Sequence, residues 1–193
     1  QMKFQRYDVS EMSMSSYLRL RPTGWPYLML PVFHNRNFSY STILIRKSAG
    51  IRQDRPEDLK GKRFGIGDYQ QSVGLWLRGI LQMEYGVKPE DMEWYQERGE
   101  HFSHTGAAAE LGLKFPAGVN LHYARKDLGR MLLDAELDAS APVALGAGKG
   151  SGIDRSHTDV SGNTDIVMLF SDPQKEAIRF YTKTGIFPPH HVT

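Results

Sequence analysis

Segments typical of strands and segments typical of helices alternate along most of the chain, and this order limits the fold more than any other feature. Short apolar or alternating runs between turn residues predict strands, at residues 27–33, 41–46, 63–67, 92–95, 119–123, 137–141 and 166–170. Helix-start signals and amphipathic runs predict helices, at residues 10–19, 55–62, 72–85, 127–133 and 173–183. Such alternation is typical of an α/β protein with a mainly parallel sheet, in which ligands bind beyond the carboxyl ends of the strands.

The remaining segments are expected to be loops, at residues 97–116, with a short helix, and at 146–162, which are rich in Gly and Ser. The clearest helix is 72–85, because its apolar residues recur at helical spacing and Gly86 follows it as a C-cap signal.

Composition excludes several classes of function. The 193 residues include 24 basic and 22 acidic side chains, for a formal net charge of +2. This near balance gives no argument for nucleic acid as a partner, so any attraction for an acidic ligand has to be local. The chain has no cysteine, which excludes a disulfide framework and a thiolate nucleophile. No run reaches the roughly 18 apolar residues of a membrane span, so we expect no membrane insertion.

The first candidate site is the segment between the strand at 63–67 and the helix at 72–85. Free backbone N–H groups and the positive end of the helix dipole meet there, and a carboxylate is a natural guest. Tyr69, Gln70, Gln71 and Ser72 can add side-chain contacts, and Arg78 can form a forked pair with a carboxylate. The alternative is that Ser72 caps its own helix and Arg78 extends into solvent.

The seven histidines do not show a strong metal spacing. His101 and His104 are three residues apart, and His190 and His191 are adjacent. Neither pair matches a zinc motif such as H-E-x-x-H, so we predict no metal. We identify no phosphate-binding loop and no dinucleotide fingerprint either, and we predict no cofactor.

Several stretches resemble known proteins. Residues 56–67 (PEDLKGKRFGIG) and 135–139 (AELDA) resemble two segments of type 2 periplasmic binding proteins. Within that superfamily the chain is similar to the 4,5-dihydroxyphthalate decarboxylase family, in stretches 7–17 (YDVSEMSMSSY), 31–38 (PVFHNRNF), 65–86 (GIGDYQQSVGLWLRGILQMEYG) and 181–191 (YTKTGIFPPHH). Members of that family extend further at both ends, so the chain resembles the middle of one.

The resemblance implies a fold of two α/β lobes with a ligand cleft between them. Residues 1–45 would form part of lobe 1, residues 46–145 mainly lobe 2, and residues 146–193 a loop and a crossover back toward lobe 1. It also implies a decarboxylase of a hydroxylated aromatic dicarboxylic acid, giving protocatechuate from 4,5-dihydroxyphthalate. The partner would be a small aromatic carboxylate, and a homo-oligomer is compatible with the sequence.

The resemblance also assigns roles to residues. His190 or His191 would be the general acid, because imidazole titrates near neutral pH. Glu11 would bind the phenol, with Ser13 beside it in the cleft. Arg36 would clamp a carboxylate together with Gln70 and Ser72. Phe38, Tyr69, Gln71, Trp76 and Arg78 complete the predicted binding set.

Two other functions remain open on the sequence alone. A non-catalytic solute-binding protein of an ABC importer would have the same fold and the same anion site. A sensory or thiamine-precursor-type binding module is a third candidate, because fold alone does not decide function. We expect a cytoplasmic location for the enzyme, or a periplasmic one if a signal peptide precedes Gln1.

Overall fold

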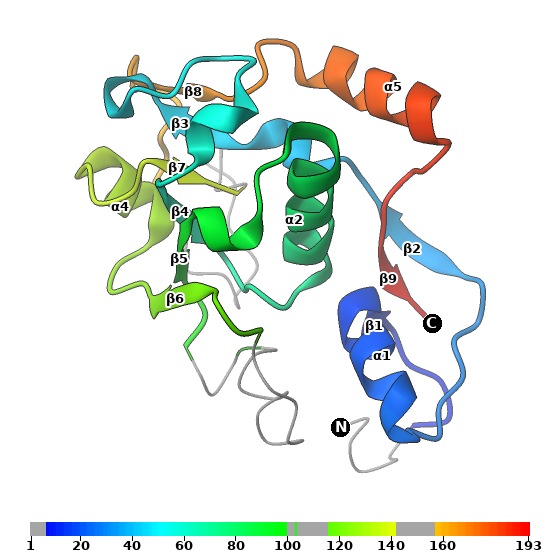
Figure 1. The fold of residues 1–193 in the computed structure, drawn as a ribbon. Coiled ribbons are helices and arrows are strands. Elements are labelled where there is room, and N and C mark those ends of the chain that lie inside the picture. Colours follow the sequence, from blue (N-terminus) through cyan, green and yellow to red (C-terminus); the bar gives the residue numbers. More distant parts are fainter. Residues whose placement is uncertain (1–6, 100–102, 104–115, 142–156) are drawn as a thin grey trace.

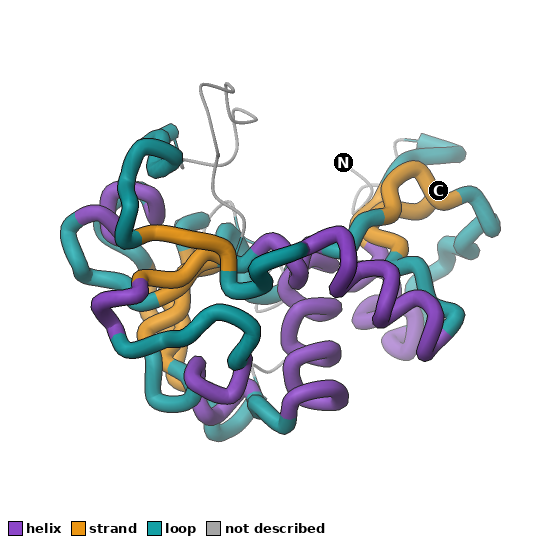
Figure 2. Tube along the Cα trace, turned by 90° about the horizontal axis from the view of Figure 1, so that it is seen from above, coloured by secondary structure: helices purple, strands orange, loops and turns teal. Residues whose placement is uncertain are grey.

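The computed structural model describes residues 7–99, 103, 116–141 and 157–193, which form two lobes of unequal size (Figure 1). The small lobe contains a three-stranded sheet in the order β1-β9-β2, and the large lobe a six-stranded sheet in the order β6-β5-β4-β7-β3-β8. Seen from above, the two sheets lie at opposite ends of the molecule, with helices between them (Figure 2). The predicted class, an α/β protein with two lobes, is confirmed, while the exact domain boundaries stay a prediction.

The small lobe joins the first and the last described segments of the chain. Strands β1 (Met12–Ser13) and β2 (Phe33–Arg36) both pair antiparallel with β9 (Pro189–Val192). Helix α1 (Met14–Leu20) follows β1 directly and continues into a 3-10 turn, η2 (Arg21–Thr23). The helix predicted at 10–19 therefore begins later than expected, because residues 12 and 13 pair with β9 first.

The strand predicted at 27–33 is wrong. Residues 27–32 form no strand, although the Leu30 N–H donates to the Thr193 carbonyl at 2.7 Å and the Val32 carbonyl accepts the Thr193 N–H at 3.2 Å, and β2 begins only at Phe33. Pro31 explains the difference, because proline has no N–H to donate to a sheet and is confined to strand edges and ends. Several apolar side chains of this run are exposed, with Leu28 at 73% and Leu30 at 48% of their full accessibility, while Tyr27 and Met29 are half-buried.

The large lobe is built around β4 (Arg63–Ile66), which pairs in parallel with β5 (Glu93–Gln96) and β7 (Ala139–Ser140). Strand β6 (Asn120–Tyr123) extends this parallel part beside β5. Strand β3 (Leu44–Arg46) is antiparallel to both β7 and β8 (Ile166–Met168). The prediction of a mainly parallel sheet is confirmed, because β4 to β8 run in one direction and β3 alone among the described strands of this sheet runs against them.

Of the strand predicted at 41–46, only the last three residues form a strand. Residues Ser39–Thr42 form a 3-10 turn, η3, before β3 begins at Leu44. The hydroxyl groups of Ser41 and Thr42 donate to the carbonyls of Phe38 and Ser39, at 2.9 and 3.0 Å. Such local bonds offer the backbone an alternative to the sheet.

The helices of the large lobe lie close to their predicted positions. Helix α2 (Ser72–Tyr85) has the predicted bounds and ends at Gly86, which adopts a left-handed φ of 64°. Helices α4 (Leu128–Leu133) and α5 (Pro173–Thr184) begin at the caps Asp127 and Asp172, whose carboxylates accept backbone N–H groups. The predicted helix at 55–62 is a shorter 3-10 turn, η5 (Pro56–Leu59). Two further 3-10 turns are η4 (Lys47–Ala49) and η6 (Pro89–Asp91). The predicted loops at 97–116 and 146–162 lie mostly outside the described residues.

The core fixes α2 against the sheet and joins the lobes. Leu77 and Leu81 of α2 are buried in the same cluster as Phe64 and Trp94. The connections between the lobes, residues 37–43 and 185–188, meet where the ring of Phe38 stacks on Phe187 at 4.9 Å. In the described part of the chain no helix is long and apolar enough to cross a membrane.

Candidate functional site

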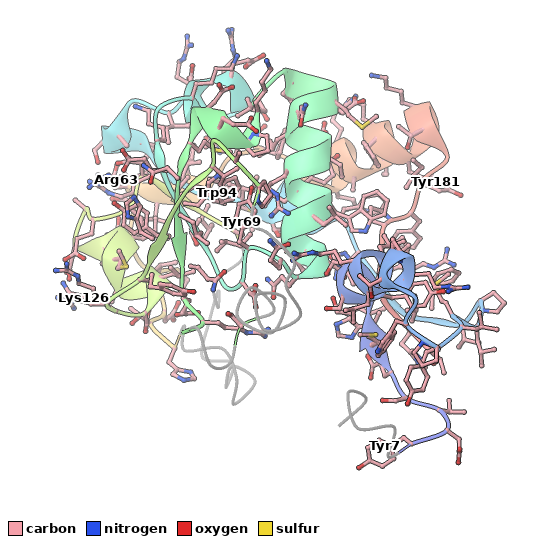
Figure 3. The ribbon with its side chains drawn as sticks, turned by 60° about the horizontal axis from the view of Figure 1, so that its bottom comes forward. Tyr7, Arg63, Tyr69, Trp94, Lys126 and Tyr181 are labelled. Carbon is pink, nitrogen blue, oxygen red and sulfur yellow. The ribbon has the colours of Figure 1, made fainter. Side chains whose placement is uncertain are left out.

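The predicted segment 68–72 lies at the carboxyl ends of β4 and β5, where α2 begins. The backbone N–H of Tyr69 donates to Oε1 of the buried Gln96 at 2.9 Å, and the N–H of Gln70 donates to Asp68 at 3.0 Å. Tyr69 packs edge-on against Trp94 at 5.2 Å, and Figure 3 shows these two side chains next to each other beside α2. The segment is therefore held rigidly at the position where α/β proteins bind ligands.

Three serine hydroxyls connect this segment to the small lobe. Oγ of Ser72 accepts the backbone N–H of Ser15 at 3.1 Å and shares a hydrogen bond of 2.9 Å with Oγ of Ser13. Oγ of Ser15 donates to the carbonyl of Gln70 at 2.6 Å. The capping alternative for Ser72 is wrong, because Gln71 is the N-cap residue of α2 and the Ser72 hydroxyl faces the small lobe.

Arg78 reaches back from α2 to the same segment. Its guanidinium lies 3.7 Å from the centre of the Tyr69 ring, and Nη1 donates to the Tyr69 carbonyl at 2.5 Å. Burial lowers the pKa of Arg78, although Tyr69 and Asp68 act in the opposite direction. The solvated alternative for Arg78 is therefore wrong, and its remaining N–H groups are donors near the start of α2.

Gly74 makes room for this arrangement. A Cβ atom at Gly74 would lie 2.8 Å from the Tyr69 carbonyl oxygen and 3.0 Å from Nη1 of Arg78. Gly74 was not among the predicted site residues. Its spacing four residues before Arg78, on the same side of one helix, is the signal that could have found it.

Two further arginines, also missed, lie close to the buried carboxylate of Asp68. Nη1 of Arg98 is 3.9 Å from Oδ2 of Asp68, and the two side chains are 13% and 0% exposed. Burial lowers the pKa of Arg19 in α1, and the attraction of Asp68 opposes this shift. Arg19 also interacts with Arg78. These described side chains thus bring three guanidinium groups to the surroundings of the Asp68 carboxylate.

Glu11 and His191 form a pair on the small sheet. Nδ1 of His191 lies 2.5 Å from Oε1 of Glu11, and both side chains are about half exposed, at 46% and 54%. His191 is opposite Ser13 in the pairing of β1 with β9, and Glu11 is two residues before Ser13. Alternation along a strand places all three on one face of the small sheet. This is the face from which Ser13 contacts Ser72.

His190 points to the other face and is 2% exposed. Its Nε2 is 3.1 Å from the carbonyl of Asn37, and its buried Nδ1 has no hydrogen-bond partner among the described residues. Burial lowers the pKa of His190 below its ordinary value, so the ring is neutral at neutral pH. A general acid has to hold a proton near operating pH, which does not suit the neutral ring of His190. The role of general acid for His190 or His191 stays a prediction.

Three predicted residues lie around this centre with other partners. Arg36 is exposed in β2, with its guanidinium 4.6 Å from the centre of the Phe33 ring. Phe38 packs on Phe187 and lines a hollow of about 410 Å³ between η3 and α5. Trp76 donates its indole N–H to the Pro189 carbonyl at 2.7 Å and so ties α2 to β9. Ligand roles for Arg36, Phe38, Gln71 and Trp76 stay predictions.

The part of the chain that the structure describes offers no evident metal site. Among those residues, no three His, Asp or Glu side chains come together as metal ligands would.

The fold and the site together define a two-lobed α/β protein with an arginine- and serine-rich centre where its lobes meet. No family model matches the chain. A 4,5-dihydroxyphthalate decarboxylase of Comamonas testosteroni is 37% identical over 188 residues, which are 96% of this chain and 52% of that protein. One of Pseudomonas putida is 36% identical over 178 residues, which are 91% of this chain and 63% of that protein. The chain is thus similar to 4,5-dihydroxyphthalate decarboxylases along nearly its whole length, and it spans between half and two thirds of the length of these relatives.

Among solved structures, the periplasmic aliphatic sulphonate-binding protein of Escherichia coli resembles the chain with a TM-score of 0.40 and 14% identity. This similarity covers 96% of the chain and 47% of that protein.

Proposed function

We propose that this protein decarboxylates a hydroxylated aromatic dicarboxylic acid of the 4,5-dihydroxyphthalate type, giving protocatechuate. The observation that carries the proposal is the combination of an arginine- and serine-rich centre with the pair Glu11–His191 on the adjoining face of the small sheet. The first can hold carboxylates, and the second can deliver a proton. The names of the two relatives support the choice of reaction.

The chemistry requires a proton on the ring before CO₂ leaves. A hydroxyl para to the departing carboxylate loses its proton and pushes electrons into the ring, and the ipso carbon then takes a proton from a general acid. The C–C bond to the carboxylate breaks next, CO₂ departs, and the electron pair restores the aromatic ring. A general acid in the right place contributes about 100-fold or more to such a step.

In this proposal His191 is the acid. Glu11 accepts a hydrogen bond from Nδ1–H and fixes the orientation of the imidazole, which leaves Nε2–H to protonate the ring carbon. The exposed oxygen of Glu11 is also available to the phenol, as the family resemblance implies. His191 regains its proton from solvent after turnover, because both members of the pair are about half exposed.

The carboxylate that stays on the ring is held by the serine cluster and Arg78. Hydroxyl groups rotate freely, so Ser13 and Ser72 can exchange their mutual hydrogen bond for bonds to an oxyanion. The start of α2 adds the favourable end of a helix dipole. Together these donors satisfy an anion without requiring a metal ligand.

The test is release of CO₂ and formation of protocatechuate from 4,5-dihydroxyphthalate by the purified protein, with and without divalent metal. We expect His191→Gln to lower kcat by about 100-fold or more. His157→Gln, which alters an exposed histidine of the large lobe, serves as the control and should retain full activity. Absence of CO₂ release from this acid and from related hydroxybenzoates would sink the proposal.

Binding of such acids without turnover would favour the solute-binding alternative instead. Calorimetry with 4,5-dihydroxyphthalate separates the two, because only the enzyme consumes the ligand during the titration. We also propose a cytoplasmic location for the enzyme, which cell fractionation with an antibody to the chain can check. Recovery in the periplasmic fraction would contradict it.

A further inference from the structure

Arg19 lies in α1 one helical turn after Ser15, the residue of this helix that is hydrogen-bonded to the large lobe. It is four residues after Ser15 in α1, and residues at this spacing share one face of a helix. Ser15 is 3% exposed and contacts both Gln70 and Ser72 of the large lobe. The Arg19 side chain, itself half-buried, therefore faces the same junction one turn further along.

Arg19 shares its nearest negative charge with other guanidinium groups. Asp68 is fully buried and attracts it, while Arg78 repels it. Arg98 approaches the same carboxylate to 3.9 Å. Among the described residues Asp68 is the carboxylate that attracts both Arg19 and Arg78, and one carboxylate cannot neutralise two guanidinium groups that are partly withdrawn from water. A ligand that brings one negative charge to each of these two arginines would relieve that cost.

We propose that Arg19 is a specificity-determining residue that binds the second carboxylate of an aromatic dicarboxylate, so that the site prefers dianions to monoanions. The proposal rests on the proposed function, in which Ser13, Ser72 and Arg78 hold the first carboxylate. A guanidinium is suited to this role because its planar N–H groups can fork onto both oxygens of a carboxylate. Since Arg19 comes from α1, the dianion would contact both lobes at once.

The experiment compares the binding of phthalate and benzoate by calorimetry. Neither compound has the hydroxyl that the reaction needs, so binding is measured without turnover. The wild-type protein should bind phthalate more tightly than benzoate. Arg19→Gln should weaken phthalate binding by about tenfold or more, because a charged hydrogen bond is lost, and should change benzoate binding little.

The matched control is Arg21→Gln. Arg21 is exposed, lies two residues further along the chain, and its replacement removes the same charge. Phthalate affinity should be unchanged in this variant. Arg19→Lys retains the charge but loses the planar fork, so it should show an intermediate loss of affinity. Thermal unfolding of all the variants shows whether each is folded before its affinity is interpreted.

Two results would overturn the inference. One is an Arg19→Gln variant that is folded and retains the wild-type preference for phthalate. The other is an equal loss of affinity for both ligands, in Arg19→Gln or in the control. A wild-type protein that releases CO₂ while Arg19→Gln keeps the preference refutes only the role of Arg19. A wild-type protein that shows the preference, loses it in Arg19→Gln and releases no CO₂ supports the inference and refutes the decarboxylase.

Discussion

The substitution Gly74→Ala adds a methyl group beside Arg78 and the segment 68–72. It tests whether these groups are as tightly packed as the structure shows. The new Cβ atom would lie 2.8 Å from the Tyr69 carbonyl oxygen and 3.0 Å from both Nη1 of Arg78 and Cδ1 of Ile66. The Arg78 side chain can move aside, but the Tyr69 carbonyl belongs to the backbone of the site. Gly74→Ala therefore has to displace the segment or the start of α2.

The size of the effect follows from two opposing contributions to the free energy of unfolding. Alanine in place of glycine inside a helix stabilises it by about 1 kcal/mol. Overpacking a well-filled region destabilises by about 1–3 kcal/mol. The net result for Gly74→Ala is between neutral and a loss of about 2 kcal/mol. Gly79 lies in the same helix, and a Cβ atom there would meet no described atom within 4 Å, so Gly79→Ala should gain about 1 kcal/mol.

Urea unfolding of the two variants beside the wild type measures this difference, which should be about 1–3 kcal/mol at an unchanged m-value. Gly74→Ala should also weaken phthalate binding, because Arg78 leaves its position over Tyr69. Gly79→Ala should bind as the wild type does. The reasoning is refuted if Gly74→Ala stabilises the protein as much as Gly79→Ala and retains full affinity.

Two further predictions concern groups near the junction of the lobes. Burial lowers the pKa of His190 below 6.5, so stability from the neutral ring is fully present above about pH 6.5 and is lost as the pH falls toward the folded pKa. Urea unfolding between about pH 7.5 and about pH 5 should show a steeper loss in the wild type than in His190→Phe, and equal slopes would contradict this prediction. Ser72→Ala leaves the buried N–H of Ser15 without its acceptor and should lower the free energy of unfolding by about 1–3 kcal/mol, as judged by the same assay.

The elements that the sequence predicted well are those whose signals are local. Helix α2 has an apolar pattern at helical spacing and a glycine at its end, and both its bounds agree with the structure. Strand β4 agrees within one residue for a similar reason. The strand expected at 27–33 failed because Pro31 outweighs the apolar run around it. The reversed direction of β3 depends on how distant segments pair, which no local pattern records.

For the candidate site too, the residues that are neighbours in the sequence were predicted and the partners from distant segments were not. The sequence placed four of the site residues together because they lie in the segment after β4 or within α2, namely Tyr69, Gln70, Ser72 and Arg78. Partners from elsewhere in the chain were less visible. Arg19 comes close to them only because α1 packs against the start of α2, across the junction of the lobes. The alternative role of Ser72 as a simple cap failed for the same reason, since its true partners lie in α1 and β1.

The net charge of the whole chain and the charge of the site show why composition could not reveal the ligand. The chain has a formal net charge of +2, and Arg19, Arg78 and Arg98 with Asp68 have the same excess by themselves. The other charges cancel, and exposed ones are screened within about 8 Å at physiological salt. Charges that are partly buried are screened much less, so a dianion at the site responds mainly to these four residues. The proposed selectivity for dicarboxylates would therefore depend on a local arrangement that any overall count of charges conceals.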